Sequence, residues 1–203
     1  MSDDTRPMSD EPPALFLSAS FPQPGRAENF AHSDPAALAD AVTAIARAVL
    51  QREARLICGG HPTITPLLLY VASEYGWRHQ LIVYQSERFR DVVPDETWRL
   101  GRDGYGELRF TPTIGEIGED LRVMRHEAFT AADYRGAVFI GGMEGIIDEY
   151  KLFSELQPGA DRFALSGPGG AAAELPGTVA PNVDLASRRY AAVALEIVRA
   201  LGL

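Results

Sequence analysis

The sequence predicts an α/β protein of the Rossmann-like, doubly wound class, with a mostly parallel sheet covered by helices on both faces. Short apolar runs alternate with segments whose apolar residues recur at helical spacing, as expected for strands that alternate with helices. Several apolar runs end in glycine or other small residues, which is typical of the turns that follow parallel strands. The 203 residues are 46% hydrophobic and 23% charged, so the chain can bury one sizeable core.

The first predicted strand, 14–20, is an apolar run that ends in small polar residues, as expected for a strand buried on both faces. A loop with two prolines and a glycine follows it. Either Ser33 or Asp34 can cap the next helix, and Pro35 suits its first turn. Over 36–52 the apolar residues recur every three or four positions, which predicts a helix with one buried face.

The same alternation continues to the end of the chain. Further strands are predicted at 54–60, 80–86, 107–113 and 136–142, and a sixth strand with a glycine turn at 161–170. Helices are predicted at 66–76, where Gly76 ends the helix, and at 118–131, 143–157 and 184–201, the last capped by Asp184. The charged stretch 87–106 is predicted to be irregular, with one helical turn near Pro94.

The composition limits the possible domain organisation and the possible binding partners. Residues 1–13 are polar, acidic and proline-bearing, which predicts a flexible tail before a single domain at 14–203. The formal charge of −9 argues against nucleic acid or an anionic membrane as the main partner, because both attract clustered Lys and Arg. Cys58, the single cysteine, is interpreted as a core residue and fits a reducing cytoplasm. No apolar run approaches the roughly 18 residues of a membrane span.

Five strand ends carry small or glycine-rich turns: SASFPQPG, CGGHPTITP, YQSE, GGMEG and SGPGG. The carboxyl ends of parallel strands meet at one edge of the sheet, so these turns are expected to form one crevice. There the backbone can approach a phosphate closely, and the following helices offer free N–H groups. The sequence therefore predicts a site for a nucleotide or a nucleotide-derived ligand, with the segment 171–182 as a loop over it.

The predicted ligand-binding residues all lie in or beside these turns. They are Ser18, Ala19, Ser20, Arg26, Gly59, Gly60, His61, Thr65, Gln85, Ser86, Gly141, Gly142, Met143, Glu144, Gly145, Gly167 and Gly169.

Several of these side chains have a structural alternative that stays open. Ser18 and Ser20 could bond phosphate or ribose, or could simply end the first strand. Arg26 is expected to act as a mobile phosphate clamp. His61 could stack on a base or donate to a phosphate, or could be a structural loop residue. Gln85 could read a base edge. Glu144 could bond ribose hydroxyls, or could simply favour the dipole of its helix.

Several other site classes are disfavoured by the motifs. No segment matches G-x-G-x-x-G or the P-loop pattern, which argues against a standard dinucleotide fingerprint and an ATPase phosphate loop. No G-x-S-x-G elbow is present, so a serine hydrolase is not expected. The four histidines are scattered without metal-ligand spacing, and neither a metal nor a cofactor is predicted.

Together with LFLSASFPQP near the start, GGHPTITPLLLYVA and FIGGMEGIIDEY resemble the SLOG superfamily. That superfamily joins the Lonely Guy (LOG) phosphoribohydrolases, the DNA-processing Smf/DprA proteins and ligand-sensing domains found beside TIR and Sir2 effectors. The chain resembles the last, bacterial-conflict type most. The resemblance implies an ADP-ribose-like signal as ligand, a homodimer or larger assembly, and a separately encoded effector.

Two further residues are implied by the likeness to LOG enzymes, which carry an arginine on one helix and a glutamate after a glycine motif. The matching residues here are Arg125 and Glu149, although an ungapped count lands on Asp148. In LOG enzymes this pair assists cleavage between base and ribose phosphate. Here Ile140 replaces the motif proline, and the motif threonine is missing. The altered loop favours a sensor that binds without turnover, with an N-glycosidic phosphoribohydrolase acting on nucleoside monophosphates as the alternative.

Overall fold

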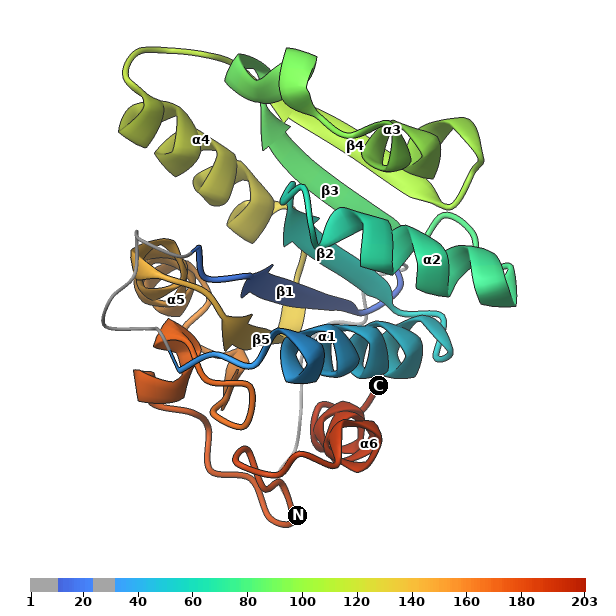
Figure 1. Ribbon diagram of the computed structural model, residues 1–203, viewed down its shortest axis with the longest axis vertical. Coiled ribbons are helices and arrows are strands. Elements are labelled where there is room, and N and C mark those ends of the chain that lie inside the picture. Colours follow the sequence, from blue (N-terminus) through green and yellow to red (C-terminus); the bar gives the residue numbers. More distant parts are fainter. Residues whose placement is uncertain (1–10, 24–31) are drawn as a thin grey trace.

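In the computed structural model, which describes residues 11–23 and 32–203, six strands form one sheet in the order β4-β3-β2-β1-β5-β6 (Figure 1). Every neighbouring pair is parallel. The strands are β1 (Ala14–Ser20), β2 (Arg55–Gly59), β3 (Leu81–Ser86), β4 (Gly106–Thr111), β5 (Tyr134–Gly141) and β6 (Asp161–Leu165). The α/β Rossmann-like fold predicted from the alternating pattern is confirmed.

Helices cover both faces of this sheet. The α-helices are α1 (Pro35–Leu50), α2 (Thr65–Tyr75), α3 (Asp95–Arg102), α4 (Ile117–Thr130), α5 (Glu144–Leu156) and α6 (Tyr190–Ala200). Two short 3₁₀ helices are η2 (Glu87–Val92) and η3 (Ala171–Glu174). The buried residues of α1, α2 and α6 belong to one hydrophobic cluster, and those of α4 and α5 belong to the other. Among the described residues, no helix is long and apolar enough to cross a bilayer.

The side chains of β1 alternate between the two faces of the sheet and so contribute to both hydrophobic clusters. Leu15 and Leu17 belong to the α1 side, whereas Ala14 and Phe16 belong to the α4 and α5 side, because successive side chains point to opposite faces. Phe16 packs edge-on against Phe129 of α4, with ring centroids 4.7 Å apart. The next even position of β1 is Ser18, so the apolar row towards α4 and α5 ends in a hydroxyl.

Several predicted helix ends are confirmed. The Asp34 carboxylate accepts a hydrogen bond of 3.1 Å from the backbone N–H of Ala37, and Pro35 is the first residue of α1. Gly76 ends α2 in the left-handed conformation, with φ of 71°.

Two predictions of local structure are wrong. The stretch after β3 is more regular than predicted: Ser86 Oγ accepts from the Arg88 N–H and starts η2, and the helical turn predicted near Pro94 is the full helix α3. The last helix begins at Tyr190 and not at Asp184. The Asp184 carboxylate instead accepts from the N–H of Ala186 within a turn, which is a common alternative use of a short acidic side chain.

The sheet order places a topological switch beside β1. The chain runs outward from β1 through β2 and β3 to β4, and then returns to place β5 on the other side of β1. At such a point the connections leave in opposite directions, which opens a crevice outside the carboxyl ends of the strands. The end of β1 is therefore where the fold best accommodates a ligand.

Candidate active and ligand-binding site

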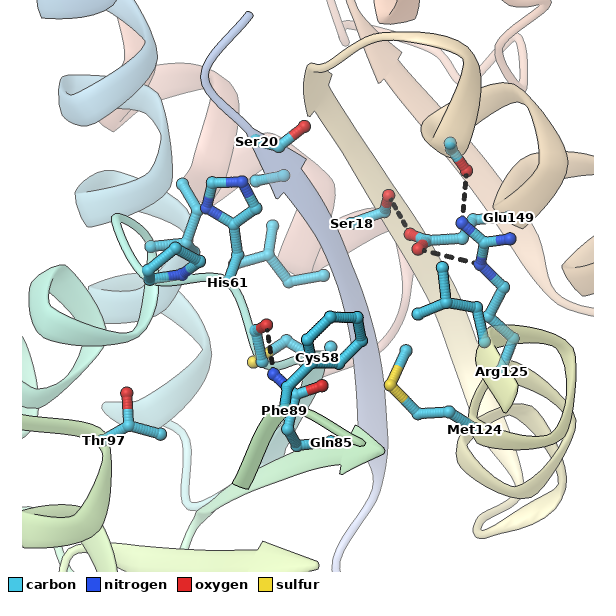
Figure 2. A pocket seen from close by; sticks show the side chains of 18 of the residues that line it. Ser18, Ser20, Cys58, His61, Gln85, Phe89, Thr97, Met124, Arg125 and Glu149 are labelled. Atoms are coloured by element: carbon cyan, nitrogen blue, oxygen red, sulfur yellow. Dashed lines mark hydrogen bonds and ion pairs between the residues drawn. The ribbon is translucent and has the colours of Figure 1, made fainter. Parts of the chain in front are cut away.

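A cavity of about 420 Å³ lies at the carboxyl ends of β1, β2 and β3, within the range for sites that hold small ligands. Helices α4 and α5 and the segment after β3 complete its walls (Figure 2). The lining residues are Leu17, Ser18, Ala19, Ser20, Cys58, Gly59, Gly60, His61, Pro62, Ile64, Gln85, Phe89, Val92, Val93, Pro94, Thr97, Leu121, Met124, Arg125, Met143, Gly145, Ile146 and Glu149.

The central feature of the polar wall is a carboxylate cluster formed by Ser18, Arg125 and Glu149. Ser18 Oγ donates to Glu149 Oε2 at 2.6 Å, and Arg125 Nε donates to Glu149 Oε1 at 3.2 Å (Figure 2). Arg125 also donates to the carbonyl oxygen of Gly145 at 3.3 Å. Ser18 of β1 and Arg125 of α4 thus fix the carboxylate carried by α5 through both of its oxygens.

The structure also distinguishes the two acidic residues that the sequence count left open. The Glu149 side chain is 19% exposed and lines the cavity. Its neighbour Asp148 is 64% exposed, and its carboxylate lies 3.8 Å from Arg125. One residue along a helix rotates the side chain by about 100°, which turns Asp148 to the outside. A held carboxylate at Glu149 can accept hydrogen bonds from ribose hydroxyls or activate a water molecule.

His61 lies across the cavity from the carboxylate cluster (Figure 2). Its Nδ1 accepts a hydrogen bond of 3.3 Å from the backbone N–H of Thr63 and lies 2.9 Å from the Thr63 hydroxyl. Burial of the ring lowers the pKa of His61, because the charged form is poorly solvated there. The neutral ring therefore carries its proton on Nε2, which can donate to a ligand.

Cys58 lines the cavity but is not suited to act as a nucleophile. The residue is 1% exposed. Burial, and secondarily the nearby charge of Glu149, raises the pKa of its thiol to about 12. The thiolate is the reactive form of cysteine, so a protonated Cys58 fits the predicted core role.

The turn after β2 is held open by backbone hydrogen bonds. The N–H of Gly60 donates to the carbonyl oxygen of Tyr84 at 2.7 Å, and Gln85 Nε2 donates to the carbonyl oxygen of Gly60 at 2.8 Å. The N–H of Ser86 donates to Gln85 Oε1 at 2.9 Å. Gln85 lines the cavity, but both ends of its amide are bonded to backbone. The geometry of Gln85 is that of a residue that positions the backbone of the turn after β2.

Thr65, Ser86 and Glu144 were predicted to bind ligand, but the structure places them outside the cavity lining. The Thr65 hydroxyl is buried and lies 2.6 Å from Thr97 Oγ1, while Ser86 caps η2. Glu144 is exposed at the start of α5, where its charge favours the helix dipole. Glu144 thus fits its structural alternative, and the hydroxyls of Thr65 and Ser86 are both engaged within the protein.

Gly141 and Gly142 at the end of β5, and Gly167 and Gly169 after β6, are packed against protein and do not line the cavity. A Cβ on Gly141 would lie 2.2 Å from Leu38 Cδ1, and one on Gly142 would lie 2.9 Å from Ile146 Cβ. A Cβ on Gly167 would meet the carbonyl oxygen of Ser187 at 3.0 Å, and one on Gly169 that of His32 at 2.4 Å. The turn after β6 therefore contributes nothing to the cavity lining, whereas the turn after β5 contributes Met143 and Gly145 but not its paired glycines. The expectation that all five turns share one crevice is corrected to this extent.

Arg26 lies outside the described residues. The remaining predicted residues, Ser18, Ala19, Ser20, Gly59, Gly60, His61, Met143 and Gly145, do line the cavity, together with Arg125 and Glu149.

One part of the lining was missed entirely: the segment 89–94, which contributes Phe89, Val92, Val93 and Pro94. Its sequence, FRDVVP, lies within a charged stretch without a glycine turn or helical period. The short apolar run could have been noticed, but nothing in it indicates which side faces the sheet.

Charge in the cavity is balanced. Among the described lining residues, Arg125 is the one arginine or lysine and Glu149 is the one carboxylate. They neutralise each other through the contact described above. Within the described part of the chain, no group of three His, Cys, Asp or Glu side chains is placed to hold a metal ion.

In a comparison with protein families, the model of the SLOG cluster3 family matches residues 28–195. Among solved structures, the X-ray structure of TM1055, a structural-genomics target, is similar with a TM-score of 0.56 and 16% sequence identity. That similarity covers 92% of this chain and 96% of the other, and at this identity it concerns the fold alone. Comparison with curated proteins finds no significant match.

Proposed function

The chain belongs to the SLOG cluster3 family, and from this premise we propose that the cavity binds a nucleotide-derived ligand as a signal. Membership of this family supports a nucleotide-related function in general. The observation that carries the proposal is the cavity at the carboxyl ends of β1 and β2, with the carboxylate cluster in its polar wall. That position is where open parallel sheets bind ligands.

The polar wall offers complementary groups for the sugar and phosphate of such a ligand. Glu149 can accept from ribose hydroxyls, and the Nε2–H of His61 can donate. Met143 and Gly145 line the cavity at the start of α5, where the first N–H groups of a helix point outward. A phosphate placed there would meet unpaired donors and the positive end of the helix dipole.

We further propose that the protein binds its ligand without turnover. The loop at the start of α5 carries Glu144 and lacks the threonine of the LOG motif, since Gly145 and Ile146 follow. Both changes weaken the grip on a phosphate that catalysis would require. An ADP-ribose-like compound is the candidate signal, in a bacterial conflict setting. Self-association or a separately encoded effector would then read the bound state.

A second function, N-glycosidic hydrolysis of a nucleoside monophosphate, is supported by the contact between Arg125 and Glu149. In that reaction the bond between the base and C1′ of the ribose breaks. Water adds its hydroxyl group to C1′, and the base leaves with the remaining proton. Glu149 would activate the water or stabilise the oxocarbenium-like carbon, and Arg125 would orient the carboxylate.

The two functions are separated by measuring melting temperature and base release on the same samples, with AMP and ADP-ribose as probes. The proposal expects at least one compound to raise the melting temperature, because a ligand of the folded state stabilises it by mass action. It expects no free base by chromatography. Base release that Glu149→Gln abolishes, and that Asp148→Asn preserves, would establish the hydrolase. If neither compound stabilises the protein or is cleaved, both functions are wrong.

A further inference from the structure

We propose that Phe89 stacks on the base of the ligand. The inference rests on the proposed nucleotide-binding function and deepens it by naming a residue that contacts the base. It follows from the way the cavity divides into an apolar and a polar half.

The apolar half is built by the segment 89–94 and by α4. Phe89, Val92 and Val93 form one side, and Met124 of α4 lies on another. Val92 is 72% exposed although it lines the cavity, and Figure 2 shows Phe89 projecting into it. This apolar surface is left uncovered in the free protein. A planar base would cover it, and contact between a base and an aromatic ring is favourable for any base.

Contacts on the outer side hold this wall in place. Arg88 Nε donates to Asp120 Oδ2 at 2.5 Å, and the buried Asp120 also accepts from the N–H of Ile114 at 2.7 Å. The guanidinium carbon of Arg90 lies 3.8 Å from the centre of the Phe110 ring. Residues on both sides of Phe89 are therefore anchored, so the wall is formed before a ligand arrives. Preorganisation of this kind lowers the entropic cost of binding.

The test is calorimetric titration of the full chain with adenosine, AMP, ADP-ribose and ribose 5-phosphate. Phe89 should contribute to the binding of each of the three compounds that carry a base: adenosine, AMP and ADP-ribose. Phe89→Ala is expected to weaken AMP and adenosine about ten-fold, which corresponds to the loss of one stacked base. Ribose 5-phosphate should bind equally to both proteins. Tyr70→Ala, an exposed aromatic on α2 outside the lining, is the matched control.

Two further variants keep the test decisive if Phe89→Ala does not fold. Phe89→Trp retains a ring face and should retain AMP affinity, whereas Phe89→Leu retains only apolar bulk and should lose it. Equal AMP affinity in the Trp and Leu variants would overturn the inference and leave nucleotide binding intact. Absence of binding by all four compounds would overturn the proposed function as well.

Discussion

The glycine turns at the carboxyl edge of the sheet look alike in sequence but divide into two kinds in space. The turn after β2, with Gly59 and Gly60, opens onto the cavity. The turns after β5 and β6 pack against each other: a Cβ on Gly170 would lie 2.6 Å from the carbonyl carbon of Gly141. The first turn keeps space free for a ligand. The second kind lets two loops approach closely, although Met143 and Gly145 of the turn after β5 still reach the cavity lining.

The comparison shows that glycine at a strand end indicates close approach without saying what approaches. At Gly59 the nearest atom to a Cβ would be Met124 Cε at 3.7 Å, which is ordinary contact. At Gly170 the neighbours are backbone atoms that cannot move aside. Substitution should therefore separate the two kinds, with stability changes at one and affinity changes at the other.

The largest effect is expected at Gly170. Its φ of 72° and ψ of −173° lie in a region that essentially only glycine occupies. Gly170→Ala should lower the free energy of unfolding by about 3 kcal/mol or more, because strain adds to the clash with Gly141. Gly59→Ala is the matched control and should cost about 1 kcal/mol or less. Urea denaturation measures both, and equal losses would erase the distinction between the two kinds of turn.

A smaller effect is expected when the carboxylate cluster loses its cation. Arg125→Met keeps most of the apolar volume but leaves Glu149 bonded only by Ser18. The expected loss is about 1–3 kcal/mol in the free energy of unfolding, since a partly buried charge loses its partner. Arg122→Met, an exposed arginine of the same helix, should change it by less than about 0.5 kcal/mol. If Arg125→Met leaves the free energy of unfolding unchanged, then the cluster is not needed to hold the cavity wall.

Ser18→Ala tests the other donor in the cluster. Loss of the 2.6 Å hydrogen bond to Glu149 should lower the free energy of unfolding by about 1 kcal/mol. Ser20→Ala, two residues further along β1 and outside the cluster, should stay within about 0.5 kcal/mol of wild type. If denaturation shows a larger loss in the free energy of unfolding for Ser20→Ala than for Ser18→Ala, then the hydroxyl of Ser18 does not position the carboxylate.

The smallest effect near neutral pH concerns Cys58. Its thiol pKa is raised to about 12, so the folded state disfavours the thiolate. The stability that this provides is complete below the unfolded pKa of about 8.5 and is lost as pH rises towards 12. Alkylation by iodoacetamide at pH 8 should therefore be at least about ten-fold slower in native than in urea-unfolded protein. Equal rates would mean that the cavity floor opens to solvent.

The sequence by itself determined the fold class and most of the elements. Continuous apolar runs such as 14–20 are strands buried on both faces, and capping by Asp34 and Gly76 fixed two helix ends. These are local signals, because a cap or a run of buried side chains depends on neighbours in sequence. The stretch after β3 was mispredicted because the cap at Ser86 is a single weak signal within charged residues.

Tertiary structure alone decided which strand ends remain open. Glu149 rather than Asp148 faces the cavity because of the rotation of α5, and its partner Ser18 is 131 residues away along the chain. Gly170, which belongs to a separate loop, packs against the backbone of Gly141. Such contacts depend on where distant segments of the chain pack, and no local sequence pattern encodes that packing. The kinds of residue present at the site were therefore readable from the sequence, while the shape and charge balance of the cavity were not.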